Sequence, residues 1–151
     1  MEMLVARVAA VGAGKPIERS STTLSDLERL VLDDYKLNGR KSIRRVPSAF
    51  RHLAAYFGKS KLVREITSEQ ITSYKLHRKA EKHRQGDGAS SATVNRELAA
   101  LKRGYSLAIE AGYLTSRPII KLLSEDNARQ GFVEAGDLAR LLAELPGYLR
   151  G

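Results

Sequence analysis

The chain has 151 residues, of which 42% are hydrophobic, so it is long enough to bury one core and too apolar to be disordered. It contains no Cys, which excludes a disulfide framework and a thiolate zinc site, and no apolar run reaches the roughly 18 residues of a membrane span. The formal net charge is +9, and residues 40–84 carry the excess, with 13 Lys or Arg against three Asp or Glu.

Concentrated positive charge favours a polyanionic partner, nucleic acid first and an anionic membrane second. The plain alternative is a solvated basic face that keeps the protein soluble. The basic segments lack a wide face of exposed apolar residues, which argues against a membrane partner. We expect a cytoplasmic protein.

Residues 1–22 show no sustained period and are predicted to form a loose arm. Within them, Gly12 to Lys15 resembles the end of a phosphate-binding loop. Ala9 stands at the first glycine position of that motif, and Pro16 replaces the Ser or Thr that would bind magnesium. No nucleotide or other cofactor is therefore expected.

A first helix is predicted from Ser25 to Leu37. Ser25 and Glu28 have the spacing of a capping box, and Asn38-Gly39 ends the pattern. The apolar side carries Leu27, Leu30 and Val31, with Leu37 closing the stripe.

A second helix is predicted from Ser42 to Phe57, with Pro47 near its first turns, where it could delay the start or kink the helix. A core stripe follows helical spacing through Ile43, Val46, Phe50, Leu53 and Phe57. The opposite side has no acidic residue and presents Arg44, Arg45, Ser48, Arg51 and His52. Such a face is either simply solvated or binds phosphates.

A third helix is predicted from Thr67 to about His83, because Thr67 and Gln70 have capping-box spacing. It buries Ile71 and Tyr74, with Leu76 as a further candidate. Basic residues crowd its second half, where the helix dipole favours them. His77 and His83 lack the i, i+4 spacing of a shared metal site, so no metal is expected.

A fourth helix, from Ser90 to Leu114, organises the rest of the chain. Its apolar stripe is regular and comprises Val94, Leu98, Leu101, Tyr105 and Ala108. Ser90 and Ser91 signal its start and Gly112 its end. Off the stripe lies a polar, basic face, with Glu97 beside it, made of Thr93, Asn95, Arg96, Lys102 and Arg103.

After Pro118 breaks the pattern, four apolar residues are predicted to plug the end of the bundle: Ile119, Ile120, Leu122 and Leu123. Residues 124–131 are predicted as a linker, followed by a short extended piece and a helix over 137–145. The chain thus divides into an arm (1–22), a helical domain (23–123) and a short strand-helix fragment (124–151), which we expect to open a further, truncated domain.

The order of these elements resembles the tyrosine recombinases of the phage-integrase type. The resemblance rests on the charged second helix, ITSEQI at the start of the third, ATVNRELAALKRGYSLAIEAGYL in the fourth, and the tail FVEAGDLARLLAELP. It covers Thr23 to about Leu145 and implies an all-α, four-helix core-binding (SAM-like) bundle followed by the first elements of the catalytic domain. In that family the bundle clamps one side of the recombination-site duplex, with helices that match the second and fourth here against the major groove.

The resemblance implies double-stranded DNA as the partner and DNA contacts from eight residues: Arg44, Arg45, Ser48, Arg51, Thr93, Asn95, Arg96 and, as a weaker candidate, Lys102. Arg and Lys would hold phosphates, which supplies affinity without sequence preference. Asn95 and Arg96 are candidates to read base edges, although phosphate contact is the expected role of each.

Family members cleave DNA with a tyrosine nucleophile assisted by arginines, a lysine and histidines. No His-x-x-Arg sequence occurs here, so we assign no catalytic residue and no small-molecule substrate, and we expect DNA binding without cleavage. The alternative function is a protein-interaction module that associates with a full-length recombinase or other recombinase protomers. That association would use the apolar residues of the tail, Leu138, Leu141, Leu142 and Leu145.

Overall fold

The computed structural model describes residues 21–83, 86–125, 140 and 144. The predicted arm up to residue 20, its Gly12 to Lys15 segment and most of the predicted tail fragment lie outside these residues. In the described part the chain forms four α-helices, namely α2 (Leu24–Leu37), α3 (Val46–Phe57), α4 (Ser68–Ala80) and α5 (Ser91–Glu110). The smaller elements are the 3-10 turns η1 (Lys41–Arg45) and η2 (Val63–Glu65), and the antiparallel strands β1 (Lys82–His83) and β2 (Gly86–Asp87).

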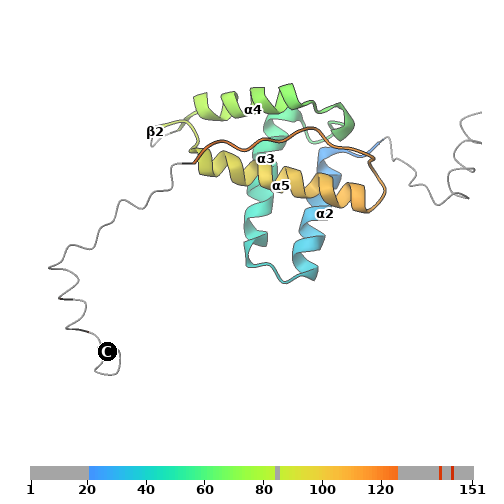
Figure 1. The fold of residues 1–151 in the computed structure, drawn as a ribbon, viewed down its shortest axis with the longest axis horizontal. Helices are drawn as coiled ribbons and strands as arrows, with labels where there is room; N and C mark the ends of the chain where they lie inside the picture. Colours follow the sequence, from blue (N-terminus) through green and yellow to red (C-terminus); the bar gives the residue numbers. More distant parts are fainter. Residues whose placement is uncertain (1–20, 84–85, 126–139, 141–143, 145–151) are drawn as a thin grey trace, which may run out of the picture.

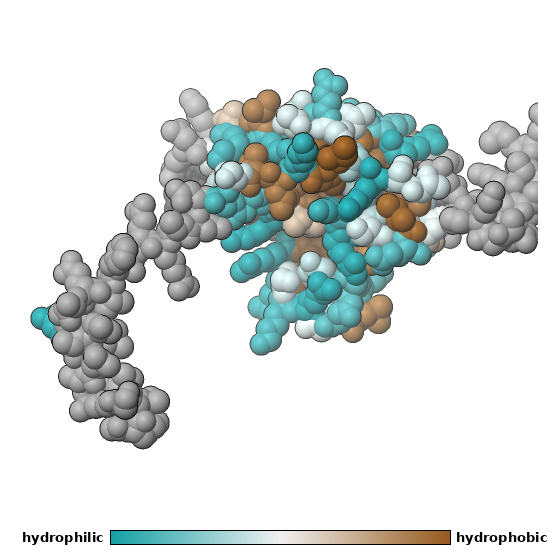
Figure 2. Space-filling view, viewed as in Figure 1, coloured by the Kyte–Doolittle hydropathy of each residue, from teal (hydrophilic) through white to brown (hydrophobic). Residues whose placement is uncertain are grey.

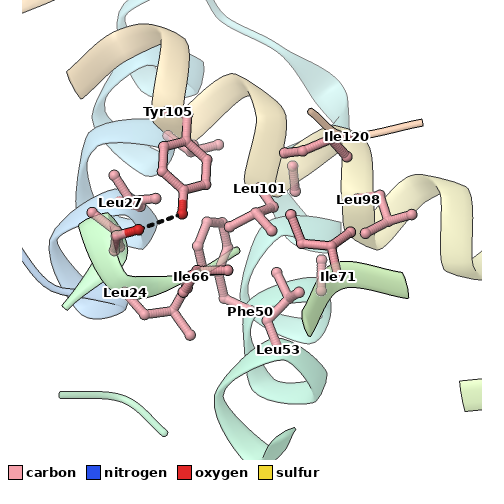
Figure 3. Packing of buried hydrophobic residues seen from close by; sticks show 14 of the residues in the cluster. Leu24, Leu27, Phe50, Leu53, Ile66, Ile71, Leu98, Leu101, Tyr105 and Ile120 are labelled. Atoms are coloured by element: carbon pink, nitrogen blue, oxygen red, sulfur yellow. Dashed lines mark hydrogen bonds between the residues drawn. The ribbon is translucent and has the colours of Figure 1, made fainter. Parts of the chain in front are cut away.

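Helix α5 lies at the centre of the bundle (Figure 1). Helices α2 and α3 run side by side in opposite directions, α5 crosses both of them, and α4 runs alongside α5. The predicted stripe of α5, from Val94 to Ala108, is confirmed because all five of its residues are buried. Figure 3 shows Leu98, Leu101 and Tyr105 facing buried residues of α2, α3 and α4. The all-α fold class is confirmed, with the short β1–β2 hairpin as an addition between α4 and α5.

The start of α2 corrects the predicted capping box. Thr23, not Ser25, is the cap, and its side chain and that of Asp26 form the reciprocal bonds of the box. Thr23 pairs with Leu62 in an isolated antiparallel bridge, which holds its backbone in the extended conformation that a cap requires. The hydroxyl of Ser25 instead donates to the carbonyl of Lys59. The box of Thr67 and Gln70 at the start of α4 is confirmed.

Two further helix boundaries and the exposure of two leucines differ from the prediction. Helix α4 ends at Ala80 rather than at about His83, and Lys82–His83 form β1 instead. Helix α3 begins at Val46 rather than Ser42, because Pro47 occupies its first turn and residues 41–45 form η1 instead. Leu37 does not close the stripe of α2 but is 87% exposed, since the last turn of α2 extends beyond α5 (Figure 1). Leu76 is likewise exposed, on the side of α4 opposite its buried residues.

Two glycines determine how α5 ends and packs. Gly112 has a φ of 71°, and the Tyr113 and Gly112 amides donate to the carbonyls of Ala108 and Ile109, which closes the helix as predicted. Gly104 faces α2 so closely that a Cβ there would lie 2.9 Å from the Cβ of Leu27. The two helix backbones therefore approach more closely than a side chain at residue 104 would allow.

Residues 115–125, which we name the strap, run back along α4 and α5 in an extended conformation (Figure 1). The amide of Ile119 donates to Ser68 Oγ at 2.9 Å, and Lys75 Nζ donates to the carbonyl of Lys121 at 2.9 Å. Of the four predicted plug residues, Ile120 is buried and Leu123 half-buried, but Ile119 and Leu122 are exposed. The plug prediction is wrong for these two because an extended strap turns side chains to both of its sides. No helix within the described ranges is both long and apolar enough to cross a lipid bilayer.

Candidate nucleic-acid interface

A groove lies between α3 and α5. It consists of two adjoining hollows of about 200 and 240 Å³, both lined by Arg45, Ala49 and Arg96. The remaining lining residues are mainly small or polar, and they include Tyr35, Ser42, Arg44, Ser48, His52, Thr93, Glu97, Ala99 and Ala100. We call this feature the α3–α5 groove.

The structure brings five of the eight predicted DNA-binding residues to this groove: Arg44, Arg45, Ser48, Thr93 and Arg96. Residue 45 ends η1 directly before α3, and residue 48 follows one turn later in α3. Residues 93 and 96 are one turn apart on α5, so they share a helix face. Arg45 and Arg96 line both hollows, so the two helices contribute to one basic surface. Contact with DNA stays a prediction for all five residues.

The positive charge of the groove is not neutralised by neighbours. Arg44, Arg45 and Arg96 are exposed, and none forms an ion pair with any residue that the structure describes. Figure 2 shows that hydrophilic residues dominate the part of the bundle formed by the far ends of α2 and α3. These three guanidinium groups are therefore available to an anion from outside the chain.

Arg103, from the predicted basic face of α5, differs in this respect. Its guanidinium donates to both carboxylate oxygens of Asp34 on α2, at 2.7 and 3.2 Å. These hydrogen bonds are the main cause that lowers the pKa of Asp34 below its usual value. Arg103 thus joins α5 to α2 instead of adding to the charge of the groove.

Two other predicted residues lie outside the groove. Arg51 Nη2 lies 3.4 Å from Ser48 Oγ, and Arg51 lines a neighbouring hollow with Pro47, Phe50 and Lys59. It extends the basic face of α3 by one turn. Lys102 is exposed on α5 but lines neither hollow of the groove.

The structure contradicts the predicted position of Asn95. The prediction places its side chain on an exposed face, whereas Asn95 is 5% exposed. Its Nδ2 donates to the carbonyl of Leu123 at 2.9 Å and to the carboxylate of Glu125, and its Oδ1 accepts from the amide of Leu123 at 2.7 Å. Both ends of the side-chain amide are therefore bonded to the strap, which leaves Asn95 no free edge for a base.

Glu97 is a second correction, because it is 3% exposed and does not lie on a solvated face. Arg78 of α4 donates to its carboxylate from Nη2 at 2.7 Å and from Nε at 3.0 Å, and the hydroxyl of Tyr74 donates at 2.6 Å. The bond to Glu97 raises the pKa of Arg78, while burial followed by the same carboxylate raises the pKa of Tyr74. Among the described residues, Glu97 is the one carboxylate that lines the groove, and the charge of Arg78, which is buried beneath the groove surface, neutralises it.

This buried network was not predicted from the sequence, although the positions of Glu97 and Arg78 in the sequence indicate it. Glu97 falls three residues after Val94 and four before Leu101, and so on the apolar stripe of α5. Arg78 falls one turn after Tyr74 on the stripe of α4. A charged residue on each of two apolar stripes indicates a buried pair, because buried charges need partners.

Residues 23–122 match the family model described as the phage integrase SAM-like domain. The match covers more than half of the chain, includes both helices of the groove and extends to Leu122 of the strap. No curated protein and no solved structure matches the chain significantly. The tail leucines of the alternative function, at 138, 141, 142 and 145, lie outside the described residues.

Proposed function

Because the chain belongs to the phage integrase SAM-like domain family, we propose that it binds double-stranded DNA as the core-binding domain of a tyrosine-recombinase-type integrase. The family match supports a role in tyrosine recombination. The observation that carries the proposal is the gathering of three exposed, unpaired arginines, Arg44, Arg45 and Arg96, along one groove of the described chain.

The groove suits a phosphate backbone. A guanidinium can donate two parallel hydrogen bonds to a phosphate, and the hydroxyls of Ser48 and Thr93 offer further donors beside it. Ala49 and Ala99 also line the groove, and their small side chains leave room for a duplex to approach. Since the amide of Asn95 is bonded to the strap, Arg96 is the remaining candidate of the two for reading a base edge.

The buried network supports the same function. An unpaired carboxylate at Glu97 would repel a phosphate in the groove, and the positive charge of Arg78 offsets that repulsion. Because both residues are almost fully buried, Arg78 cannot itself reach the duplex. Its contribution to DNA binding is electrostatic.

The test is fluorescence anisotropy of a labelled random duplex titrated with the protein at several salt concentrations. Each phosphate contact contributes about −0.9 to the slope of log affinity against log salt, so three contacts predict a slope of about −3. Replacing Arg44, Arg45 and Arg96 together by Gln is expected to remove most of this slope. Each of the three single variants should lower the slope by about one contact, whereas Arg29→Gln, which also removes one charge but from α2, where Arg29 pairs with Asp26, should change the slope little. Absence of binding at low salt would overturn the proposal.

We also propose that these 151 residues bind DNA without cutting it. None of the three histidines is followed by Arg at the third position, so the sequence lacks the His-x-x-Arg pair that recombinases of this family use. A supercoiled plasmid incubated with the protein is expected to remain supercoiled. Relaxed or nicked circles, absent from a control with heat-denatured protein, would contradict this proposal.

A further inference from the structure

His52 lies in the α3–α5 groove with the arginines, yet its environment differs from theirs. It follows Ser48 by one turn and Arg45 by two turns on α3, and it lines the same hollow as both. Arg44, Arg45 and Arg96 are exposed, whereas His52 is half-buried at the inner end of this face. Because Ser48 and His52 line the same hollow, a ligand bound in that hollow would lie next to the imidazole.

The imidazole has no hydrogen-bond partner within the described part of the chain. No buried side-chain nitrogen or oxygen there lacks a partner, so the ring nitrogens of His52 must keep some access to solvent. An unbonded imidazole beside several guanidinium groups can donate to an anion that the guanidinium groups attract. The imidazole of His52 is therefore a polar group that an anionic ligand in the groove can bind.

The charged groups that face His52 come from three helices. Arg51 lies next to it on α3, while Arg78 of α4, Glu81 directly after α4 and Glu97 of α5 act on it through their charges. Arg44, Arg45 and Arg96 share its hollow. Burial followed by the charge of Arg78 lowers the pKa of His52, and the carboxylate of Glu97 only partly offsets this. The free protein therefore holds a neutral imidazole at neutral pH.

Resting on the proposed function, we propose that His52 is a further DNA-binding residue, and that it takes up one proton from solvent as a backbone phosphate enters the groove. The proton adds to the unprotonated ring nitrogen, so both nitrogens become donors, and the phosphate charge stabilises the resulting imidazolium. One N–H bond forms, and the bond that held this proton in hydronium or in the buffer acid breaks. Among the described residues, no hydrogen bond depends on the imidazole of His52, so a substitution there breaks no internal hydrogen bond.

The proposal fixes the sign of the pH dependence. The phosphate raises the pKa of His52 in the complex above that in the free protein, so DNA affinity increases as pH falls through the interval between the two. Each unit of difference increases the affinity by about tenfold at the acid end. At pH values above the pKa of His52 in the complex, protonation no longer increases the DNA affinity.

The test measures the affinity for the same labelled random duplex from pH 5.5 to 8.5 at constant ionic strength. The natural chain is expected to bind about tenfold more tightly at the acid end. His52→Gln should bind with a nearly flat pH profile, and His52→Lys, which keeps a permanent charge, should bind tightly at both ends. His77→Gln, on α4 outside the groove, and His83→Gln serve as matched controls that should keep the natural profile. Circular dichroism establishes that each variant is folded.

Proton uptake can be measured directly by calorimetry. If binding takes up a proton, the observed enthalpy at pH 6.5 depends on the ionisation heat of the buffer, and this dependence should vanish in His52→Gln. DNA binding that is independent of pH, or a pH dependence that survives in His52→Gln, would overturn the role of His52 and leave the proposed function standing. Absence of DNA binding at every pH would overturn both.

Discussion

Arg78 of α4 and Glu97 of α5 form a buried, two-point ion pair, with Nη2 to Oε1 at 2.7 Å and Nε to Oε2 at 3.0 Å. The other buried residues of α4 are Ile71 and Tyr74, and Tyr74 also donates to Glu97. Helix α4 is therefore positioned by this polar network together with the packing of Ile71 and Tyr74 in the apolar core. Because the pair also lies behind the α3–α5 groove, the same contact links the packing of α4 to the charge of the proposed DNA surface.

Arg78→Met is expected to destabilise the fold by about 3–5 kcal/mol, because it leaves the Glu97 carboxylate buried without its counter-charge. Urea unfolding followed by circular dichroism measures the loss. The triple variant Arg78→Met, Glu97→Leu and Tyr74→Phe should recover most of it, since apolar residues of similar volume then replace the pair and the buried Tyr74 hydroxyl is not left without its acceptor. The double variant without Tyr74→Phe should recover only part. A triple variant as unstable as the single one would show that the pair itself is strongly stabilising.

Gly104→Ala is expected to destabilise the fold by about 1–2 kcal/mol, although Ala is the better helix former by about 1 kcal/mol. The new Cβ would lie 2.9 Å from the Cβ of Leu27 and force α5 away from α2. Thermal unfolding measures the effect. In a Leu27→Gly background, which lacks the Cβ that the new methyl would meet, the same substitution should become neutral or stabilising. A gain in stability in the natural background would contradict the close approach of the two helices.

Asn95→Ala is expected to release the strap, because it leaves the amide and carbonyl of Leu123 without their partner. The loss in stability should be about 1–3 kcal/mol. Trypsin provides a sharper measurement, since cleavage after Lys121 within the strap should become faster. Lys102→Ala, at an exposed position of the same helix, is the control. The salt slope of DNA binding should not change, and a loss of one contact from that slope would return Asn95 to the DNA surface.

Asp34→Asn is expected to cost roughly 1 kcal/mol at pH 7, because it weakens the hydrogen bonds from Arg103. The pKa of Asp34 is lowered in the folded protein, so its contribution is fully present above its usual pKa of 3.8 and is lost as pH falls through the folded value. Urea midpoints of the variant and the natural chain should therefore converge in strong acid. Asp33→Asn, next to it but exposed, should change stability little at any pH. Equal losses from both substitutions would contradict the pairing.

The features predicted correctly from the sequence depend on residues close together in the chain. The stripe of α5, the capping box of Thr67 and Gln70, and the stop at Gly112 each involve positions within about one turn of a helix. The basic face of α3 is a local feature of the same kind. Helical spacing alone places such residues on one side, without knowledge of what packs against the helix.

The features that the sequence did not predict join distant residues. Thr23 competes with Ser25 for the cap of α2, and its bridge to Leu62 decides between them. Asn95 finds its partner in the strap, a segment without periodicity, and Glu97 finds Arg78 on another helix. For the candidate site, charge and spacing indicated which residues of α3 and α5 matter. The packing of α5 across α3 determines which of them share a groove.

The strap has a consequence for geometry. Asn95 and Arg96 are adjacent on α5, and the first holds Leu123 while the second lines the groove. Residues 123 and 125, at the end of the strap, are therefore fixed to α5, the helix that would contact the duplex. A duplex bound in the groove would therefore lie at a fixed distance from the end of the strap at residue 125.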